Sequence, residues 1–339
     1  MSTPSLLDRA ITDADFARIV DELTRRGFLT GAVGTAAMLG LAACGSSGSD
    51  AVDGPGTRDI PTIHGPVRVP AHPTRVVTVS FVGTANLLDV GVVPIGGVTA
   101  GVEFLPQYAA ALKSMPLVAN EAGDVQLETV ASLKPDLIVG SDWADAGKSL
   151  LPYAKLSAIA PTALFAQAAS VGNWADQATE YADAVNRTSR LGPLRNAFTE
   201  KQRVIRRSYP ELLASQRWEL INAASGGWYR YSAQASHSQV LAAAGITFAP
   251  GAVGQKEAFA KLSYEQLGRL EDATVIGMGR AVDPAWAKTL TDQPLFTRLP
   301  AVQSGHLYDL QWFFPSSYGT ATALLEQAEG ILRRLQGTR

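Results

Sequence analysis

Residues 225–231 are the part of the chain best suited to binding a ligand. Within this segment two glycines precede three aromatic residues and an arginine. Aromatic faces pack against organic rings, and a guanidinium presents several donors in one plane to anionic oxygens. We therefore interpret Trp228, Tyr229, Arg230 and Tyr231 as ligand-binding residues. The alternative is an exposed β-turn with stacked aromatic side chains.

Other aromatic and cationic residues follow predicted strands in both halves of the chain. Ligands of open α/β sheets bind beyond the carboxyl ends of the strands, so residues at these points are candidates. The further candidates are Phe81, Phe104, Trp143, Arg280 and Trp312. The alternative for the aromatic residues is packing in a core, and for Arg280 it is a surface ion pair. Asp142 would repel an anion, so we expect it to cap a helix or to pair with an arginine.

The elements that must position these residues alternate between strands and helices. The predicted strands are residues 75–80, 92–98, 136–140, 162–165, 218–224, 273–278 and 306–310. Such alternation predicts parallel sheets with helices on both faces. It is interrupted by a helical segment without strand signals, residues 174–207, which is broken at Asn186 and at Gly192-Pro193. The sequence therefore predicts two α/β lobes joined by a long helix.

A short internal repeat supports the division into two lobes. Glu128 and Glu265 are each followed by leucine at the fifth position and by glycine at the twelfth. In each lobe the repeat predicts a helix that begins near the glutamate and leads into a buried strand. Ser263 and Gln266 have the spacing of a capping box at the second of these helix starts.

The beginning of the chain has the features of an export signal with a lipid anchor. Arg25 and Arg26 precede an uncharged stretch, residues 31–43, which is too short to span a bilayer and ends at the only cysteine, Cys44. The arginine pair indicates twin-arginine export. We predict lipidation of Cys44 and a location on the extracytoplasmic face of the cell membrane. The alternative, a buried cysteine in an anchor helix, is disfavoured because residues 45–49 have the composition of a flexible tether.

The composition excludes several classes of function. A net charge of −2 argues against nucleic-acid binding. The chain has 4 His and 1 Cys, without a metal-ligand cluster, so we expect no metal held by the protein and no cofactor. The absence of a Gly-x-Ser-x-Gly motif argues against an exported hydrolase. The expected organisation is a signal peptide at 1–43, a tether at 44–59, lobes at 60–173 and 211–339, and a connecting helical segment at 174–210.

Several segments together resemble the iron-siderophore-binding proteins of ABC importers. The matching segments are Val69-Pro70, Pro73 to Ser80, Leu88 to Gly96, Leu127-Glu128, Leu133 to Ile138, Ile159 to Thr162, Ser263 to Glu265 and Leu299 to Val302. The resemblance implies an α/β fold of two Rossmann-like lobes, a rigid backbone helix between them and a ligand cleft between the lobes.

The resemblance also implies a function without an enzymatic step. Such a protein captures a ferric siderophore, whose own groups fill the iron coordination, and delivers it to the permease of an ABC importer. Relatives of the same fold bind haem or cobalamin. Haem would require an axial Tyr or His, for which Tyr108, Tyr229 and His237 are available. The resemblance assigns Glu128 and Glu265 to contacts with permease arginines, although carboxylates are also favourable at helix starts. We expect a monomer.

Overall fold

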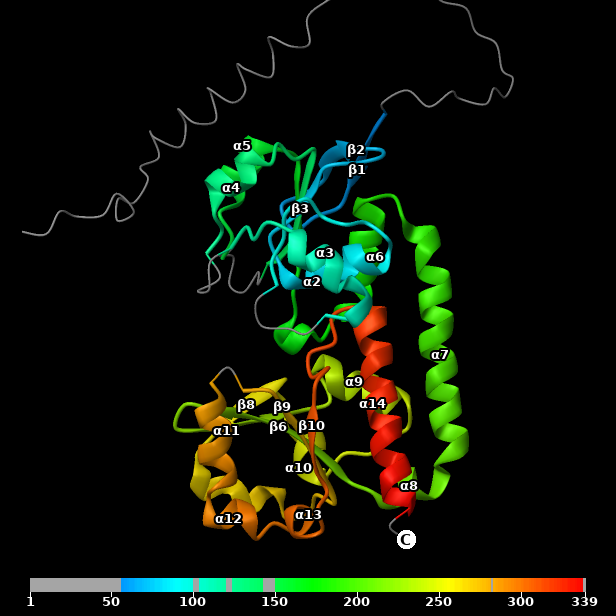
Figure 1. Cartoon of the computed structure of the whole chain (residues 1–339), viewed down its shortest axis with the longest axis vertical. Helices are drawn as coiled ribbons and strands as arrows, with labels where there is room; N and C mark the ends of the chain where they lie inside the picture. Colours follow the sequence, from blue (N-terminus) through cyan, green and yellow to red (C-terminus); the bar gives the residue numbers. More distant parts are fainter. Residues whose placement is uncertain (1–55, 100–103, 120–123, 143–149, 282, 338–339) are drawn as a thin grey trace, which may run out of the picture.

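The computed structural model describes residues 56–99, 104–119, 124–142, 150–281 and 283–337. The predicted export signal, Cys44 and Trp143 lie outside the described residues. The described chain forms two α/β lobes, one above the other in Figure 1, with a long helix along one side of both. This arrangement confirms the two-lobed α/β fold that the sequence predicts.

The first lobe is built on a parallel sheet in the order β3-β4-β5. Its strands are β3 (Val76–Thr78), β4 (Leu137–Asp142) and β5 (Thr162–Ala166). Every residue of β3 and β4 is buried, as expected for parallel strands that are covered on both faces. Leu137 and Val139 pack in the same core as helices α2 (Phe81–Asp89) and α6 (Trp174–Ala184), whereas Ile138 packs with α4 (Leu127–Ser132) and α5 (Tyr153–Ile159).

Two features of this lobe differ from the sequence prediction. An antiparallel hairpin of β1 (Thr57–Ile60) and β2 (Val67–Pro70) precedes the sheet. The strand expected at 92–98 is reduced to single bridges at Gly96 and Gly97. The chain runs very close to its neighbours there, since a Cβ on Gly96 would lie 2.4 Å from a methyl of Leu133.

The second lobe contains a mixed sheet in the order β10-β9-β6-β7-β8. Strands β6 (Trp218–Ala224), β9 (Val275–Gly279) and β10 (Leu307–Leu310) are parallel, as predicted. Strands β7 (Gly227–Tyr231) and β8 (Phe259–Leu262) run antiparallel at one edge. The aromatic segment, Gly227–Tyr231, is therefore a strand and not a loop. Only the two residues before it form the turn, where Gly226 has a φ of 68°.

The remaining helices are short and surround the two sheets. They are α3 (Ala109–Ser114), α8 (Pro210–Ser215), α9 (Ser236–Ala243), α10 (Pro250–Val253), α11 (Pro284–Thr291), α12 (Pro294–Thr297) and α13 (Pro300–Gln303). Four 3-10 turns complete the described elements, η1 (Pro106–Tyr108), η2 (Ala169–Val171), η3 (Thr188–Arg190) and η4 (Tyr264–Leu270).

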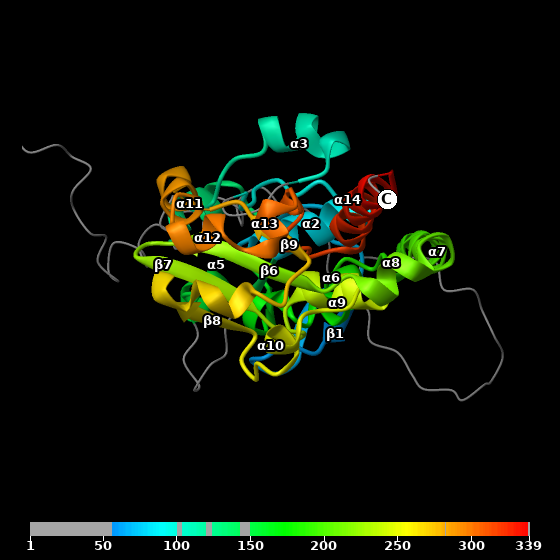
Figure 2. The same ribbon diagram turned by 90° about the horizontal axis from the view of Figure 1, so that it is seen from below.

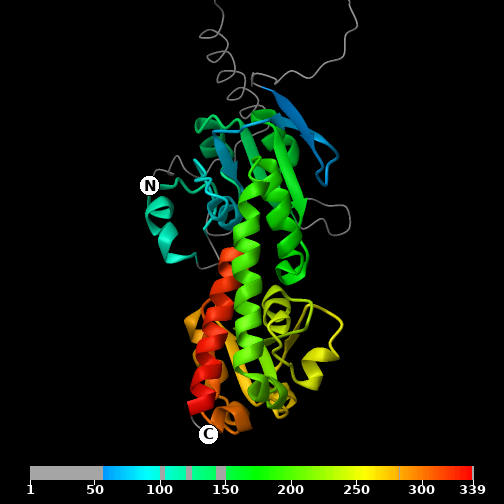
Figure 3. The ribbon, with the colours of Figure 1, turned by 90° about the vertical axis from the view of Figure 1, so that its right-hand side faces the viewer.

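Two long helices, α7 (Leu191–Ser208) and α14 (Tyr318–Gly337), lie side by side, with α7 along both lobes and α14 along the second lobe (Figures 1 and 3). Lys201 of α7 and Glu329 of α14 form an ion pair of 3.1 Å. The predicted interruption at Asn186 is confirmed, because α6 ends at Ala184 and Asn186 has a φ of 52°. The predicted interruption at Gly192-Pro193 is wrong. Pro193 lies in the first turn of α7, where a backbone N–H would have no partner within the helix.

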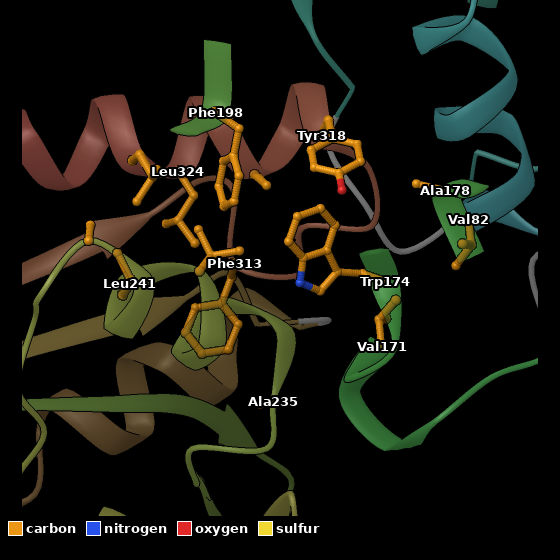
Figure 4. Packing of buried hydrophobic residues seen from close by; sticks show 14 of the residues in the cluster. Val82, Val171, Trp174, Ala178, Phe198, Ala235, Leu241, Phe313, Tyr318 and Leu324 are labelled. Carbon is orange, nitrogen blue, oxygen red and sulfur yellow. The ribbon is translucent and has the colours of Figure 1, made fainter. Parts of the chain in front are cut away.

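The hydrophobic core is continuous from one lobe to the other. Trp174 begins α6 of the first lobe, and its ring lies at edge-to-face distance from Phe198 of α7 (5.4 Å) and from Tyr318 of α14 (5.1 Å). Figure 4 shows the indole between Tyr318 and Phe313, which follows β10 of the second lobe. The guanidinium of Arg195 lies 5.7 Å from the centre of the Tyr318 ring and donates to its hydroxyl. We call Trp174, Phe198 and Tyr318 the aromatic joint.

Candidate ligand-binding site

The carboxyl ends of the strands in the first lobe are held together by a buried polar network. The hydroxyl of Tyr181 on α6 lies 2.9 Å from Ser80 Oγ, after β3, and 2.7 Å from Ser141 Oγ, on β4. Gln177 donates to Ser141 Oγ and to the carbonyl of Ala166 at the end of β5. Burial raises the pKa of Tyr181, so the phenol stays protonated. Helix α6 therefore fixes three strand ends and carries Trp174 of the aromatic joint.

Of the predicted ligand-binding residues in the first lobe, Phe81 lies next to these strand ends. Phe81 is the first residue of α2, is partly buried and packs against the main core. Phe104 is also partly exposed, while Trp143 lies outside the described residues. Asp142 is buried at the end of β4, and its carboxylate accepts backbone N–H bonds from Leu150 (3.0 Å) and Leu151 (3.4 Å). These bonds give Asp142 a structural role at the start of the next segment.

Trp228 and Arg230 point to one face of β7 and are buried there. The indole of Trp228 is fully buried and donates to the carbonyl of Ser263 at 3.0 Å. The guanidinium of Arg230 forms a bidentate ion pair with Glu219 on β6, with one N–O distance of 3.0 Å. Burial raises the pKa of Glu219, and the hydrogen bonds from Arg230 oppose that shift. A Cβ on Gly251 would lie 2.0 Å from this guanidinium.

These contacts correct the sequence interpretation of both residues. Trp228 has its polar atom bonded to backbone, and the Arg230 side chain is only 6% exposed and is bonded to a carboxylate. Neither side chain offers a surface to a ligand, and we withdraw both from the candidate set. The alternation of side chains along a strand explains the error, since every second residue of the aromatic segment faces the core.

Tyr229 and Tyr231 lie on the other face of β7, within an aromatic cluster. Tyr231 is buried, and its ring contacts His237 (4.7 Å), Phe313 (5.1 Å) and Phe314 (5.7 Å). Burial raises the pKa of the Tyr231 hydroxyl. Tyr229 is only half-buried and meets the exposed ring of Phe259 on β8 at 5.7 Å. Of the two tyrosines, Tyr229 retains exposed surface for a ligand, whereas the buried ring of Tyr231 packs against the other rings of the cluster.

The ends of the parallel strands in the second lobe face the first lobe. Residues after β10 lead directly to the start of α14, and the side chain of Asn86 on α2 donates to the carbonyl of Ser316 in this connection at 2.8 Å. Trp312, in the same connection, is half-buried, and Arg280, after β9, is exposed. Trp312 and Arg280 thus follow parallel strands whose carboxyl ends point toward the boundary between the lobes.

The two predicted docking glutamates begin equivalent elements in the two lobes. Glu128 is the second residue of α4, and Glu265 is the second residue of η4. The predicted capping box of Ser263 and Gln266 is confirmed. A hydrogen bond from the Ser263 side chain lowers the pKa of Glu265, which is fully exposed and therefore ionised at neutral pH. Glu128 is partly exposed.

Some residues that build this boundary gave no signal in the sequence. Trp174 and Tyr318 are far apart in the chain, and no local pattern connects them. Glu219 looked like an ordinary strand residue, although recognition of the hairpin at Ser225-Gly226 would have brought it near Arg230. Among the described residues, no group of three or more potential metal ligands exists. None of the described helices is long and apolar enough to cross a membrane.

The fold and the boundary site define a class of protein, a two-lobed α/β binding protein whose strand ends meet at the boundary between the lobes and whose lobes are joined by a helical linker. A sequence model of the periplasmic binding proteins matches residues 76–311, which is most of the chain. The chain therefore belongs to the periplasmic binding protein family.

Individual relatives agree with this assignment. The chain is 36% identical over 160 residues to the probable siderophore-binding lipoprotein YfiY of Bacillus subtilis (strain 168), a match that covers 45% of this chain and 47% of that protein. A siderophore periplasmic binding protein from the fuscachelin gene cluster of Thermobifida fusca superposes with a TM-score of 0.67 and 25% identity, over 78% of this chain and 98% of that one. Staphylococcus aureus SirA, solved with staphyloferrin B, shares the fold at a TM-score of 0.68 and 21% identity, over 82% of this chain and 99% of SirA.

Proposed function

We propose that the protein is an extracytoplasmic binding lipoprotein that captures a ferric siderophore and delivers it to the permease of an ABC importer. The protein is exported through the twin-arginine route, and a diacylglycerol on Cys44 anchors it to the membrane. Iron enters as part of the ligand, and the protein carries out no enzymatic step. The names of the relatives, a siderophore-binding lipoprotein and a siderophore periplasmic binding protein, support this proposal.

The observation that carries the proposal is the meeting of two sets of strand ends at one boundary. In open α/β sheets this edge is where ligands bind. The first lobe brings Ser80, Asp142 and Ala166 there, and the second lobe brings Arg280 and Trp312. Aromatic faces and a guanidinium suit the outer surface of a chelate whose own oxygens already surround the iron.

The proposed ligand contacts are the candidates whose side chains keep exposed surface, although Phe81, Tyr229 and Trp312 also pack against the main core. They are Phe81, Phe104, Tyr229, Arg280 and Trp312, together with Trp143, which is proposed from the sequence alone. All except Trp143 are described residues with partly or fully exposed side chains. Such surface is required for contact with a ligand that enters from solvent.

The described geometry gives haem less support than a siderophore. His237 is fully buried, and its ring stacks on Phe313 at 4.2 Å, so a haem iron could not reach it without displacing that ring. Burial lowers the pKa of His237 to about 3. The hydroxyl of Tyr108 donates a hydrogen bond of 3.0 Å to Asp89, and this bond would have to break before the oxygen could bind a haem iron. Of these three residues, Tyr108 and Tyr229 keep partly exposed surface.

Glu128 and Glu265 are the proposed contacts with the permease. One acidic residue at the start of an element in each lobe provides two matching charges, which suits docking onto two permease subunits. Figure 1 places α4 in one lobe and α12, against which η4 packs, in the other, both away from α7. We also propose that the protein is a monomer, because one chain already supplies two glutamates, one for each of the two permease subunits.

The proposal is tested by titrating the chain from residue 45 onward with ferric siderophores, haem and cobalamin while tryptophan fluorescence is recorded. This chain retains every described residue. We expect saturable quenching by one class of ferric siderophore and weaker quenching by the same siderophore without iron. Tight binding of haem, without binding of any siderophore, would identify haem as the ligand. Silence from the whole panel would contradict a role in the uptake of these ligands.

A further inference from the structure

The connection between the lobes carries a strong positive charge. Residues 187–208, which comprise η3 and α7 with one preceding residue, contain seven Lys or Arg and a single Glu. This segment therefore has a net charge of +6 in a chain whose total is −2, so all other residues together carry −8. Such an imbalance creates a local field that the composition of the whole chain conceals.

Most of this charge is directed to solvent and is not neutralised. Arg187, Arg190, Arg203, Arg206 and Arg207 are exposed. Among the described residues, only Arg203 of these five forms an ion pair with a carboxylate, that of Glu200 in the same helix. Figure 3 shows α7 along the full front of the molecule, with no other element over it. We call these five arginines the basic face.

The basic face adjoins the point at which the chain enters the fold. Arg58 on β1 forms an ion pair of 3.0 Å with Asp183, near the end of α6 and just before Arg187. Eleven residues separate Cys44 from Gly56, the first described residue, so the connection spans at most about 40 Å. Helix α7, with 18 residues, is about 27 Å long. A lipid on Cys44 therefore holds the bilayer within reach of the whole basic face.

We propose that the basic face rests on the anionic phospholipid headgroups of the membrane that holds the anchor. The inference depends on the proposed lipidation of Cys44 for its cellular setting, but not on the identity of the siderophore. Basic residues near a bilayer are attracted to anionic lipids, and a lipid chain combined with a basic patch fixes a protein to the surface more firmly than either alone. Charge complementarity and the position of the tether both favour this occupant.

The geometry gives the contact a functional consequence. In Figures 1 and 2, α7 lies on one side of the molecule, while α11 and α12 lie on the other, with α4 on that same side in Figure 1. The basic face and the proposed docking glutamates therefore cannot face the same bilayer together. Contact with lipid is a resting orientation, which the protein leaves in order to dock on the permease.

The test uses vesicle flotation with the chain from residue 45 onward, which lacks the lipid, so that any binding comes from the protein surface. Vesicles of phosphatidylglycerol and phosphatidylcholine are compared with pure phosphatidylcholine at about 50 mM and about 500 mM salt. The variant is Arg190→Gln, Arg203→Gln and Arg207→Gln, which spares Arg206 because its guanidinium bonds the carbonyl of Ala243.

A matched control removes three exposed positive charges elsewhere, with Lys113→Gln, Lys256→Gln and Arg298→Gln. We expect the wild type and the control to float with the anionic vesicles at low salt only, and the basic-face variant to bind at least about tenfold more weakly. Siderophore affinity should be the same in all three proteins, which separates this test from that of ligand binding. Equal vesicle binding by variant and control, or no preference of the wild type for anionic vesicles, would overturn the proposal.

Discussion

The carboxylate of Asp89, at the end of α2, accepts a hydrogen bond of 2.6 Å from the backbone N–H of Gly319, in the first turn of α14. A residue of the first lobe thus caps the helix that runs along the second. The hydroxyl of Tyr108 donates to the same carboxylate at 3.0 Å. A Cβ on Gly319 would lie 2.5 Å from Asp89 Oδ1, so only glycine allows this approach. The bond fastens the start of α14 to the first lobe.

Asp89 should give the protein a pH-dependent stability. Burial raises the pKa of Asp89 above 3.8, although the hydrogen bonds oppose this shift. Between the ordinary and the raised pKa the folded state binds more protons than the unfolded state, so the free energy of unfolding falls as the pH rises through that window. Asp89→Asn keeps an acceptor oxygen and removes the titration. We expect its free energy of unfolding, measured with urea from about pH 4 to about pH 7, to fall less than that of the wild type.

The exposed Asp59 provides the control for this measurement. Its hydrogen bond with Arg68 lowers its pKa, so Asp59→Asn should change the slope of stability against pH in the opposite sense. Asp89→Ala should lower the free energy of unfolding by about 1–3 kcal/mol for each donor that it leaves unpaired. Identical slopes for the wild type and Asp89→Asn would show that Asp89 does not titrate differently in the folded state.

The sequence predicted the lobes because their signals are local. Six of the expected strands correspond to strands of the structure, since short apolar runs such as residues 136–140 are buried on both faces. The hairpin of β1 and β2 is polar at its exposed positions and lacks such a run. The joining of the lobes was predicted only in part, because the contacts of α14 with α2 and α7 connect segments that are far apart in the chain.

The candidate site was predictable at the level of strand ends and not at the level of single side chains. Trp312 and Arg280 needed only the rule that ligands lie beyond parallel strands. For Arg230 the strand register was needed, since Ile221 pairs with Arg230 and thereby places Glu219, two residues away on the same face, beside the guanidinium. The burial of Tyr231 likewise could not be predicted without knowing which rings cover it.

Loss of the Arg230 side chain should affect folding rather than ligand recognition. Arg230→Ala leaves Glu219 buried without its partner, which typically lowers the free energy of unfolding by about 3–5 kcal/mol. The double variant Arg230→Met with Glu219→Met removes both charges and should recover most of that loss. Urea unfolding provides the free energies, and a siderophore titration provides the affinity. A stable Arg230→Ala protein with weakened binding would restore Arg230 to the ligand site.

Trp312 and Arg280 should affect ligand affinity. Trp312→Ala removes a half-buried ring at the boundary, and a loss of about 1.5 kcal/mol corresponds to roughly tenfold weaker binding. Trp286→Ala is the control, because Trp286 is also a half-buried ring beside a core but belongs to α11 and not to the connection that follows β10. Arg280→Gln should weaken an anionic siderophore more than a neutral one, as measured by the same titration. Equal losses for the two ligands would exclude charge pairing by Arg280.

The aromatic joint should restrict the movement between the lobes. Two parallel helices and a shared core resist bending, so we expect the radius of gyration from small-angle scattering to change by less than about 1 Å on ligand binding. Trp174→Ala opens a cavity in the joint and should lower the free energy of unfolding by about 3–5 kcal/mol. The same variant should show a larger change of the radius of gyration on ligand binding. Tyr318→Phe, which removes only the hydroxyl bonded by Arg195, is the milder control. A large closure in the wild type would contradict a rigid joint.

Removal of both proposed docking charges should separate capture from transport. Glu128→Ala with Glu265→Ala leaves the strand ends untouched, so the fluorescence titration should give the wild-type affinity. Uptake of radioactive iron by cells that depend on this protein should fall to the background level, because the docked complex loses its two carboxylates. Glu271→Ala with Glu326→Ala removes two other exposed charges and should leave uptake unchanged. Normal uptake by the first pair would mean that other surfaces of α4 and η4 contact the permease, and loss of uptake by both pairs would indicate a general effect of charge.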